Sequence, residues 1–322
     1  MTMMQAAVIE RYGPPEVIRI ESVPVPEPRA GEVLVRVTAA AVTSGDARIR
    51  GARFPRGFTL PARLGIGMRG PRRRVPGTVV AGTVERVGEG VTGFSPGDAV
   101  AGMTGAVFGA HAERAVVRTR ALARVSAGVG LTDAAGALFG GTTALYFLRE
   151  RTRLRPGCRV LVNGAAGSVG SAAVQLAVEA GAQVTAVAGP ANHGLLRRLG
   201  AADVVDYRET PVASLPQRFD VVFDAVGTVN REEGLRLAGE DGVVVLAAAG
   251  LADTLRARGR VITGAAPERR EHIAAVLDLV ARGALDPLTE VVGDLHALPA
   301  AHHRIDDGHK VGNLVVVPGG AA

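Results

Sequence analysis

The segment Val160–Gly189, VLVNGAAGSVGSAAVQLAVEAGAQVTAVAG, carries the clearest structural pattern of the chain. A hydrophobic run breaks into a loop with three regularly spaced glycines, a helical pattern follows, and a second hydrophobic run ends the stretch. Glycine tolerates the positive φ of a tight strand-to-helix turn and lets a phosphate approach the backbone. The free N–H groups at the start of the helix favour a pyrophosphate. The pattern therefore predicts a dinucleotide-binding unit. The expected loop contacts are Gly164, Ala166, Gly167, Ser168 and Val169.

The second hydrophobic run ends in Val187-Ala188-Gly189-Pro190, without a carboxylate. Folds that prefer NADH usually carry Asp or Glu at this point, where it binds the ribose 2′-hydroxyl. Because no carboxylate repels a 2′-phosphate here, the sequence favours NADPH. The candidate donors to that phosphate are Gly189, Asn192, Tyr207 and Arg208, and His193 either joins them or faces solvent.

Three regions of different texture follow one another along the chain. Residues 1–123 contain short β-runs split by Gly and Pro, which predicts an antiparallel, barrel-like β domain. From about Thr132 to Leu285, apolar strands alternate with amphipathic helices, which predicts a parallel doubly wound sheet. Its expected strands are Arg159–Asn163, Gln183–Val187, Asp203–Val205, Asp220–Asp224 and Gly242–Ala247.

Short β-runs return after a helix that closes at Gly283. The simplest topology folds this last segment back onto the first domain, so that the doubly wound domain is an insertion. The expected boundaries are 1–124 with 286–322 for the β domain and 125–285 for the nucleotide-binding domain.

The composition is that of a globular protein. The chain has 322 residues, 47% of them hydrophobic, which suggests two domains, and its net charge of +6 is a mild excess. A single cysteine, Cys158, excludes an intramolecular disulfide and a multi-cysteine zinc lobe. The N-terminus lacks the pattern of a signal peptide, and no apolar run reaches the ~18 residues of a membrane span. We expect a soluble, cytoplasmic protein.

Several motifs resemble one family along almost the whole chain. They are VPVPEPRAGEVLVRVTAAAVTSGDARIRG (23–51), AGTVERVGEGVTGFSPGDAVAGM (81–103), the glycine stretch, LRRLGAADVVDYRE (196–209), FDVVFDAVG (219–227) and AHHRIDDGHKVGNLVVV (301–317). The chain resembles the quinone-oxidoreductase branch of the medium-chain dehydrogenase/reductase superfamily. The resemblance implies a GroES-like β domain, a Rossmann domain and a nicotinamide cofactor in the cleft between them.

Two departures from the zinc-dependent relatives stand out. Thr43 occupies the position of a cysteine ligand, and Gly77-Thr78-Val79 replaces a Gly-His-Glu motif. A catalytic zinc needs about three protein ligands, and none assemble from this pattern. We therefore expect no metal site. Without a metal to stabilise an alkoxide, alcohol oxidation is disfavoured.

Reduction of an electron-poor acceptor does not need that metal. The expected function is NADPH-dependent hydride transfer to a quinone or another conjugated carbonyl. The near alternative is an enoyl or alkenal reductase, which adds hydride to a conjugated C=C bond by similar chemistry. A more distant alternative is an NADPH-binding protein that binds RNA or has a structural role. Only 3% of the residues are aromatic, so stacking platforms for RNA are few.

The resemblance also suggests residues for the cleft. Thr43 is a candidate hydroxyl donor and Arg48 a candidate stabiliser of a developing oxyanion. Strand packing for Thr43 and solvent exposure for Arg48 remain the alternatives. Asp46 is expected to accept hydrogen bonds within its loop. The further cofactor contacts that the resemblance implies are Thr142, Asn163, Val226, Gly227, Ala247, Ala248, Lys310 and Asn313.

An arginine-rich segment follows Asp46. Between Ala47 and Val84 there is no Asp or Glu, whereas nine arginines occur from Arg48 to Arg74. By resemblance this segment borders the substrate mouth, where basic residues would concentrate anionic substrates. An acidic, polyketide-type substrate is one hypothesis, and a solvated basic loop is the other. Phe54, Phe58 and Phe108 are candidate apolar walls, although core packing explains them equally well.

The resemblance finally suggests a homodimer. Members of the family commonly pair the edges of two Rossmann sheets, and Arg258–Ala265, RGRVITGA, is a plausible edge strand.

Overall fold

The computed structural model describes residues 2–216 and 218–319. The strands are β1 (Met3–Val8), β2 (Arg19–Pro24), β3 (Glu32–Val42), β4 (Val79–Val87), β5 (Ala99–Met103), β6 (Arg114–Arg118), β7 (Leu122–Arg124), β8 (Arg159–Asn163), β9 (Gln183–Ala188), β10 (Asp203–Asp206), β11 (Phe219–Asp224), β12 (Ala238–Leu246), β13 (Val261–Thr263), β14 (Thr289–Gly293) and β15 (Asn313–Val316). The α-helices are α1 (Ser44–Gly51), α2 (Thr59–Ile66), α3 (Leu131–Leu145), α4 (Ser168–Glu179), α5 (His193–Arg198), α6 (Arg231–Leu237), α7 (Leu251–Arg256), α8 (Arg270–Ala281) and α9 (Leu298–Asp306). Short 3₁₀ turns span Pro15–Val17, Gly105–Val107, Thr119–Ala121, Pro190–Asn192, Val212–Ser214 and Leu295–Ala297, and a π-helical turn, Tyr146–Arg151, continues α3.

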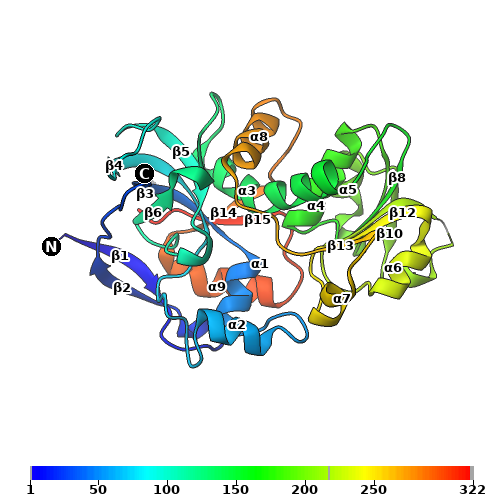
Figure 1. Cartoon of the computed structure of the whole chain (residues 1–322), viewed down its shortest axis with the longest axis horizontal. Coiled ribbons are helices and arrows are strands. Elements are labelled where there is room, and N and C mark those ends of the chain that lie inside the picture. Colours follow the sequence, from blue (N-terminus) through cyan, green and yellow to red (C-terminus); the bar gives the residue numbers. More distant parts are fainter. Residues whose placement is uncertain (1, 217, 320–322) are drawn as a thin grey trace.

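A six-stranded parallel sheet forms one half of the molecule, in the order β10-β9-β8-β11-β12-β13. Its central strands are nearly continuous apolar runs, because helices cover both faces of such a sheet. In β8, the four residues after Arg159 are all buried. β13, within the expected edge strand, does lie at an edge of this sheet. The green and yellow elements of Figure 1 show this half beside the blue and cyan β-rich half.

The other half is built on a seven-stranded sheet. Its order is β14-β15-β3-β4-β5-β7, with β6 also paired to β3, and its pairings are antiparallel except that of β14 with β15. β14 and β15 come from the end of the chain, so the C-terminal segment returns to the sheet of the N-terminal segment (Figure 1). The expected α/β class, with a GroES-like domain and a Rossmann domain, is confirmed. The domain boundaries stay predictions, because the sheets mark no single residue at which a domain ends.

α3 joins the two halves. One buried cluster runs from Val79 and Ala101 of the seven-stranded sheet through Leu138 of α3 to Val160 of β8. Glycine in α3 allows this close packing, since a Cβ on Gly140 would lie 2.2 Å from the Ser168 carbonyl oxygen. α3 therefore fixes the place where α4 begins. Within the described residues, no helix is long and apolar enough to cross a bilayer.

Candidate active site

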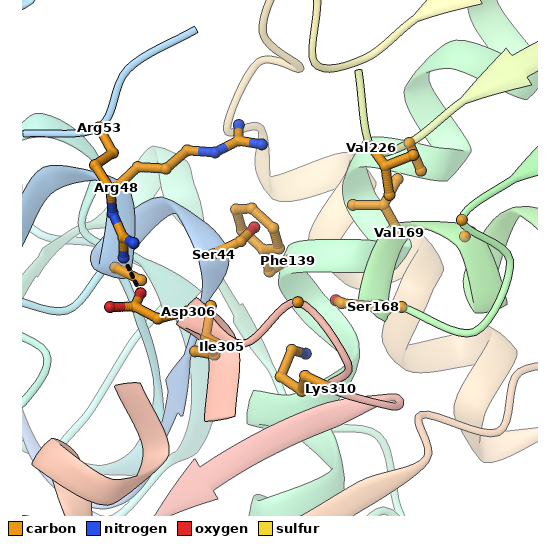
Figure 2. A pocket seen from close by; sticks show the side chains of 16 residues that line it. Ser44, Arg48, Arg53, Phe139, Ser168, Val169, Val226, Ile305, Asp306 and Lys310 are labelled. Carbon is orange, nitrogen blue, oxygen red and sulfur yellow. Dashed lines mark ion pairs between the residues drawn. The ribbon is translucent and has the colours of Figure 1, made fainter. Parts of the chain in front are cut away.

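A cavity of about 350 Å³ opens between the two halves. One wall comes from the start of α1 and the residues after it, the opposite wall from the glycine loop and the turn after β11, and the floor from the segment that follows α9. Figure 2 shows these walls facing one another. Seven of the predicted site residues line the cavity: Arg48, Gly164, Gly167, Ser168, Val169, Val226 and Lys310.

Gly164, Gly167 and Gly170 of the loop differ in what a side chain at each position would contact. Gly164 has φ +76°, and a Cβ there would lie 2.4 Å from Val226 Cγ1. A Cβ on Gly170 would lie 2.1 Å from the Gly164 carbonyl oxygen, so this glycine lets the helix pack on the turn. Gly167 is different, because a Cβ there would approach only the Gly164 oxygen, at 3.6 Å. The first and third glycines close the turn, and the second leaves the cavity surface open.

The polar groups beside the loop fit a pyrophosphate. Ser168 is the first residue of α4, and its hydroxyl is buried without a hydrogen-bond partner among the described residues. Lys310 lines the same cavity and donates to the Gly312 carbonyl. Burial, followed by the charge of Arg304, lowers the pKa of Lys310 to about 8. Gly312 N–H donates to the Ala166 carbonyl at 2.9 Å, which ties the C-terminal segment to the glycine loop.

The end of β9 meets two of the predicted phosphate donors. A Cβ on Gly189 would lie 3.7 Å from Tyr207 Cε1 and 3.8 Å from Arg208 Nη2. The sequence reasoning missed a carboxylate on the neighbouring strand, because Asp206 of β10 stands in register with Ala188. Asp206 Oδ1 accepts a hydrogen bond from the backbone of Arg208 at 2.9 Å and so takes part in the local turn.

Asn192 and His193, which follow β9, contact the backbone of residues close to them in the chain. Asn192 N–H donates to the Gly189 carbonyl at 3.0 Å and ends the 3₁₀ turn. His193 Nε2 lies 3.3 Å from the Ala188 carbonyl oxygen, so this half-buried ring turns back toward the strand.

Asn163 organises the turn after β11. Its amide donates to Asp224 Oδ1 at 2.9 Å and to the Thr228 hydroxyl at 2.7 Å. Asp224 also accepts hydrogen bonds from the backbone of Val226 at 3.3 Å and of Val229 at 3.2 Å. Burial raises the pKa of the Asp224 carboxyl, while these hydrogen bonds oppose the rise. Asp224 was not among the predicted site residues, although it precedes the cavity residues Ala225 and Val226.

The turns after β11 and β12 lie side by side. Gly227 has φ +84°, and a Cβ there would lie 2.9 Å from the Ala248 carbonyl oxygen. Ala247 N–H donates to the Asp224 carbonyl at 2.9 Å. These contacts bring together the predicted residues that follow two strands, as expected at the carboxyl edge of a parallel sheet.

Thr142 and Asn313 are among the predicted cofactor residues that do not line the cavity. Thr142 is buried in α3, where its hydroxyl donates to the Leu138 carbonyl at 2.7 Å. Asn313 is buried as well, and its amide donates to the Pro287 carbonyl at 2.5 Å. Both side chains are therefore engaged with backbone in this structure.

Thr43 caps α1. Its hydroxyl donates to Asp46 Oδ2 at 2.6 Å and accepts from the Asp46 backbone at 3.2 Å, and Thr43 N–H donates to the same carboxylate at 2.8 Å. This capping box buries Thr43 outside the cavity and engages its hydroxyl. The next residue, Ser44, lines the cavity instead. The first turn of α1 packs on Phe139, since a Cβ on Gly45 would lie 3.7 Å from its Cε2.

The predicted phenylalanines lie elsewhere. Phe54 and Phe58 belong to a segment that contacts the other half through Leu251 N–H, which donates to the Arg56 carbonyl at 2.8 Å. Phe108, with φ 57°, lines two neighbouring cavities beside Arg73 and Arg74. Neither the 54–58 segment nor Phe108 lines the main cavity. Its aromatic side chain is that of Phe139 in α3, which was not among the predicted site residues.

Residues 29–151 match the family model of the alcohol dehydrogenase GroES-like domain, and residues 199–316 match that of the zinc-binding dehydrogenases. Quinone oxidoreductase of Pseudomonas aeruginosa is 34% identical over 73% of this chain and 70% of its own length. The chain belongs to the quinone-oxidoreductase type of the medium-chain dehydrogenase/reductase superfamily.

Other relatives of this quinone-oxidoreductase-type protein differ in length. Erythronolide synthase EryA2 of Saccharopolyspora erythraea is 39% identical over 89% of this chain, which spans only 8% of that synthase. An NADPH-dependent alkenal/one oxidoreductase of Arabidopsis thaliana is 34% identical over 75% of this chain and 62% of its own length.

Two solved structures superpose on nearly the whole chain. Quinone oxidoreductase of Coxiella burnetii superposes with a TM-score of 0.86 at 25% identity, over 98% of this chain and 99% of its own. A mycobacterial protein complexed with NADPH superposes with a TM-score of 0.80 at 27% identity, over 98% and 100%.

The residues of this quinone-oxidoreductase-type chain do not fit a zinc ion. Among the described residues, no three His, Cys, Asp or Glu side chains gather in a way that could hold a metal. At the ligand positions of the zinc-dependent relatives, Thr43 caps a helix, and Thr78 and Val79 stand where the Gly-His-Glu motif has its histidine and glutamate.

Proposed function

We propose that this protein is an NADPH-dependent reductase that transfers hydride to a quinone or another conjugated carbonyl. One observation carries the proposal. The glycine loop forms one wall of the cavity together with the Ser168 hydroxyl, which has no hydrogen-bond partner in the part of the chain that the structure describes. Ser44, Arg48 and Phe139 lie on the other wall. Such an arrangement suits a cofactor and an acceptor held against one another.

The residues have separable roles in this proposal. Bound NADPH supplies the hydride. Gly167, Ser168 and Lys310 are suited to hold its phosphates, and Arg208 to pair with a 2′-phosphate. The apolar side chains of Phe139, Val169 and Val226 restrict water in the cavity. The Ser44 hydroxyl is suited to donate a hydrogen bond to the acceptor oxygen as negative charge develops on it. A conjugated acceptor spreads that charge, so this scheme needs no metal.

Reduction of a conjugated C=C bond is the second candidate function. It is favoured by the similarity to an alkenal/one oxidoreductase and to a 2-methylene-furan-3-one reductase of Solanum lycopersicum, which is 34% identical over 76% of this chain. Both reactions add hydride to a conjugated system, so the same cavity would serve either.

The proposed function is tested by titrating the purified protein with NADPH and NADH and following nicotinamide fluorescence. A panel of quinones and enones is then added to the NADPH complex. We expect tighter binding of NADPH and acceptor-dependent oxidation, and the better acceptor class chooses between the two candidate reactions. Binding of NADPH without turnover of any acceptor would instead favour the RNA-binding or structural alternative.

Substituting Arg208 tests the choice of cofactor. A charge-assisted hydrogen bond to a phosphate contributes about 1.5–3 kcal/mol, so Arg208→Gln is expected to raise the Kd for NADPH by about tenfold or more. The Kd for NADH is the internal control, because NADH has no 2′-phosphate and should bind the variant as it binds the parent protein. An equal loss for both cofactors would show that Arg208 does not read the 2′-phosphate.

We also propose a cytoplasmic homodimer in which the edges of two β13 strands pair. The proposal is supported by the position of β13 at one edge of the six-stranded sheet. Light scattering on the purified protein is expected to give twice the mass of the chain, and Ile262→Pro in β13 should reduce it to the mass of a monomer. A monomeric parent protein would refute this pairing.

A further inference from the structure

We propose that Arg48 selects acceptors that carry a permanent negative charge, such as a carboxylate or sulfonate, close to the conjugated carbonyl. The inference rests on the proposed reductase function and narrows its substrate class. It assigns the selectivity for anionic substrates to one side chain, whereas the sequence suggested a general effect of the arginine-rich segment 48–74.

The other arginines of the 48–74 segment are mostly occupied by the protein itself. Arg50 is fully buried and binds Asp306 Oδ2 at 2.5 Å, and Arg53 pairs with the same carboxylate. The Arg63 guanidinium lies 5.4 Å from the centroid of the Tyr12 ring. Arg72 donates to the Leu64 and Gly65 carbonyls at 3.0 and 2.8 Å. Arg74 pairs with Glu10 at 3.1 Å. Arg56, Arg69 and Arg73 are exposed and do not line the main cavity.

Arg48 is in a different position. Only Arg48 and Arg53 of this segment line the cavity, and Arg53 turns to Asp306. Arg48 extends from α1 into the cavity (Figure 2). Among the described residues, its guanidinium has no ion pair and no hydrogen bond, although the side chain is partly buried. Burial lowers the pKa of this guanidinium, which nevertheless stays charged at neutral pH.

A partly buried cation without a partner is unfavourable, and an anion that enters the cavity would relieve it. A carboxylate or sulfonate can accept two parallel N–H bonds from a guanidinium, which also orients the acceptor. The phosphates of the cofactor are expected on the opposite wall, near Ser168 and Lys310. Arg48 is therefore available to bind the second reactant, the hydride acceptor.

The turnover test uses two quinones that differ in one anionic group, 1,4-naphthoquinone-2-sulfonate and 2-methyl-1,4-naphthoquinone. We expect the ratio of kcat/KM for the sulfonate to kcat/KM for the neutral quinone to fall at least tenfold in Arg48→Gln. Comparing ratios between proteins cancels the different intrinsic reactivity of the quinones. Arg69→Gln is the matched control, because it removes the same charge from the same segment outside the cavity, and its ratio should stay that of the parent protein.

Two outcomes of this test would overturn the proposal. If Arg48→Gln lowers kcat/KM equally for both quinones, Arg48 acts on the oxyanion common to both reactions. If the ratio falls as much in Arg69→Gln, the segment acts as a diffuse field and no single residue selects the substrate.

A binding measurement separates this inference from the proposed reductase function. Calorimetric titration of the protein with NADP⁺ bound compares 2-naphthalenesulfonate with 2-naphthol, which are not reduced. We expect the sulfonate to bind at least tenfold more tightly, and this advantage to be lost in Arg48→Gln. Arg48-dependent sulfonate binding without turnover of any quinone would refute only the reductase function. Sulfonate binding no tighter than that of naphthol, or a Kd for NADPH that rises in Arg48→Gln while the sulfonate advantage persists, would refute the role of Arg48.

Discussion

Gly167→Ala is expected to raise the Kd for NADPH by at least about tenfold while leaving the melting temperature unchanged. A Cβ at this position approaches only one protein atom, the Gly164 carbonyl oxygen at 3.6 Å, so the folded chain accommodates the methyl group. The same methyl projects from the loop that lines the cavity, where the backbone must come close to the pyrophosphate. Fluorescence titration and thermal unfolding measure the two quantities separately.

Gly170→Ala is the contrasting variant from the same loop. Its Cβ would lie 2.1 Å from the Gly164 carbonyl oxygen and 2.8 Å from Ala165 Cα, and backbone atoms cannot move aside as a flexible side chain can. We expect this variant to lose about 1–3 kcal/mol or more of unfolding free energy. Unchanged NADPH binding by Gly167→Ala would show that the cofactor does not approach the loop at this glycine.

The second large effect is expected on the stability of the protein when the pH is lowered. His302 of α9 is fully buried, and neither ring nitrogen has a hydrogen-bond partner among the described residues. Burial, followed by the charges of His111, Arg50 and Arg53, lowers the pKa of His302 to about 2. The neutral ring is therefore folded into the protein, whereas the unfolded chain binds a proton near pH 6.5. Stability is fully present above pH 6.5 and is lost as the pH falls toward 2.

His302→Leu should remove this acid sensitivity. Between pH 7 and pH 5 the parent protein is expected to lose about 2 kcal/mol of unfolding free energy relative to the variant. Denaturant unfolding at both pH values measures the difference. His303→Gln is the matched control, since His303 is the neighbouring residue but is 52% exposed and pairs with Glu16. Equal acid sensitivity in the parent and His302→Leu would show that a different group controls acid unfolding.

Part of the candidate site was open to prediction because it is local in sequence. The spacing of Gly164, Gly167 and Gly170 determines a turn whatever surrounds it, since backbone conformation and the start of a helix are properties of adjacent residues. The apolar runs of β8 and β9 likewise predict buried parallel strands. For this reason the fold class agrees with expectation, and the three glycines lie together on one wall of the cavity.

The other wall was harder to predict because it depends on side-chain direction. Thr43 and Ser44 are adjacent, yet the capping box turns Thr43 inward and leaves Ser44 on the cavity. Phe108 and Phe139 are equally apolar, and only the packing of α3 between the sheets decides which of them reaches the site. Family resemblance could suggest positions here, but not which way each side chain points.

The role of the arginines was decided at the longest range. The chain shows directly that nine arginines follow Asp46 without a compensating acid among residues 47–84. Folding brings in Asp306, which lies 256 residues beyond Arg50 and pairs with both Arg50 and Arg53. Charge pairing depends on distance in space and not on distance along the chain. Adjacent residues therefore determine the glycine turn, whereas the return of the C-terminal segment pairs Asp306 with Arg50 and Arg53, and Arg48 has no ion pair among the described residues.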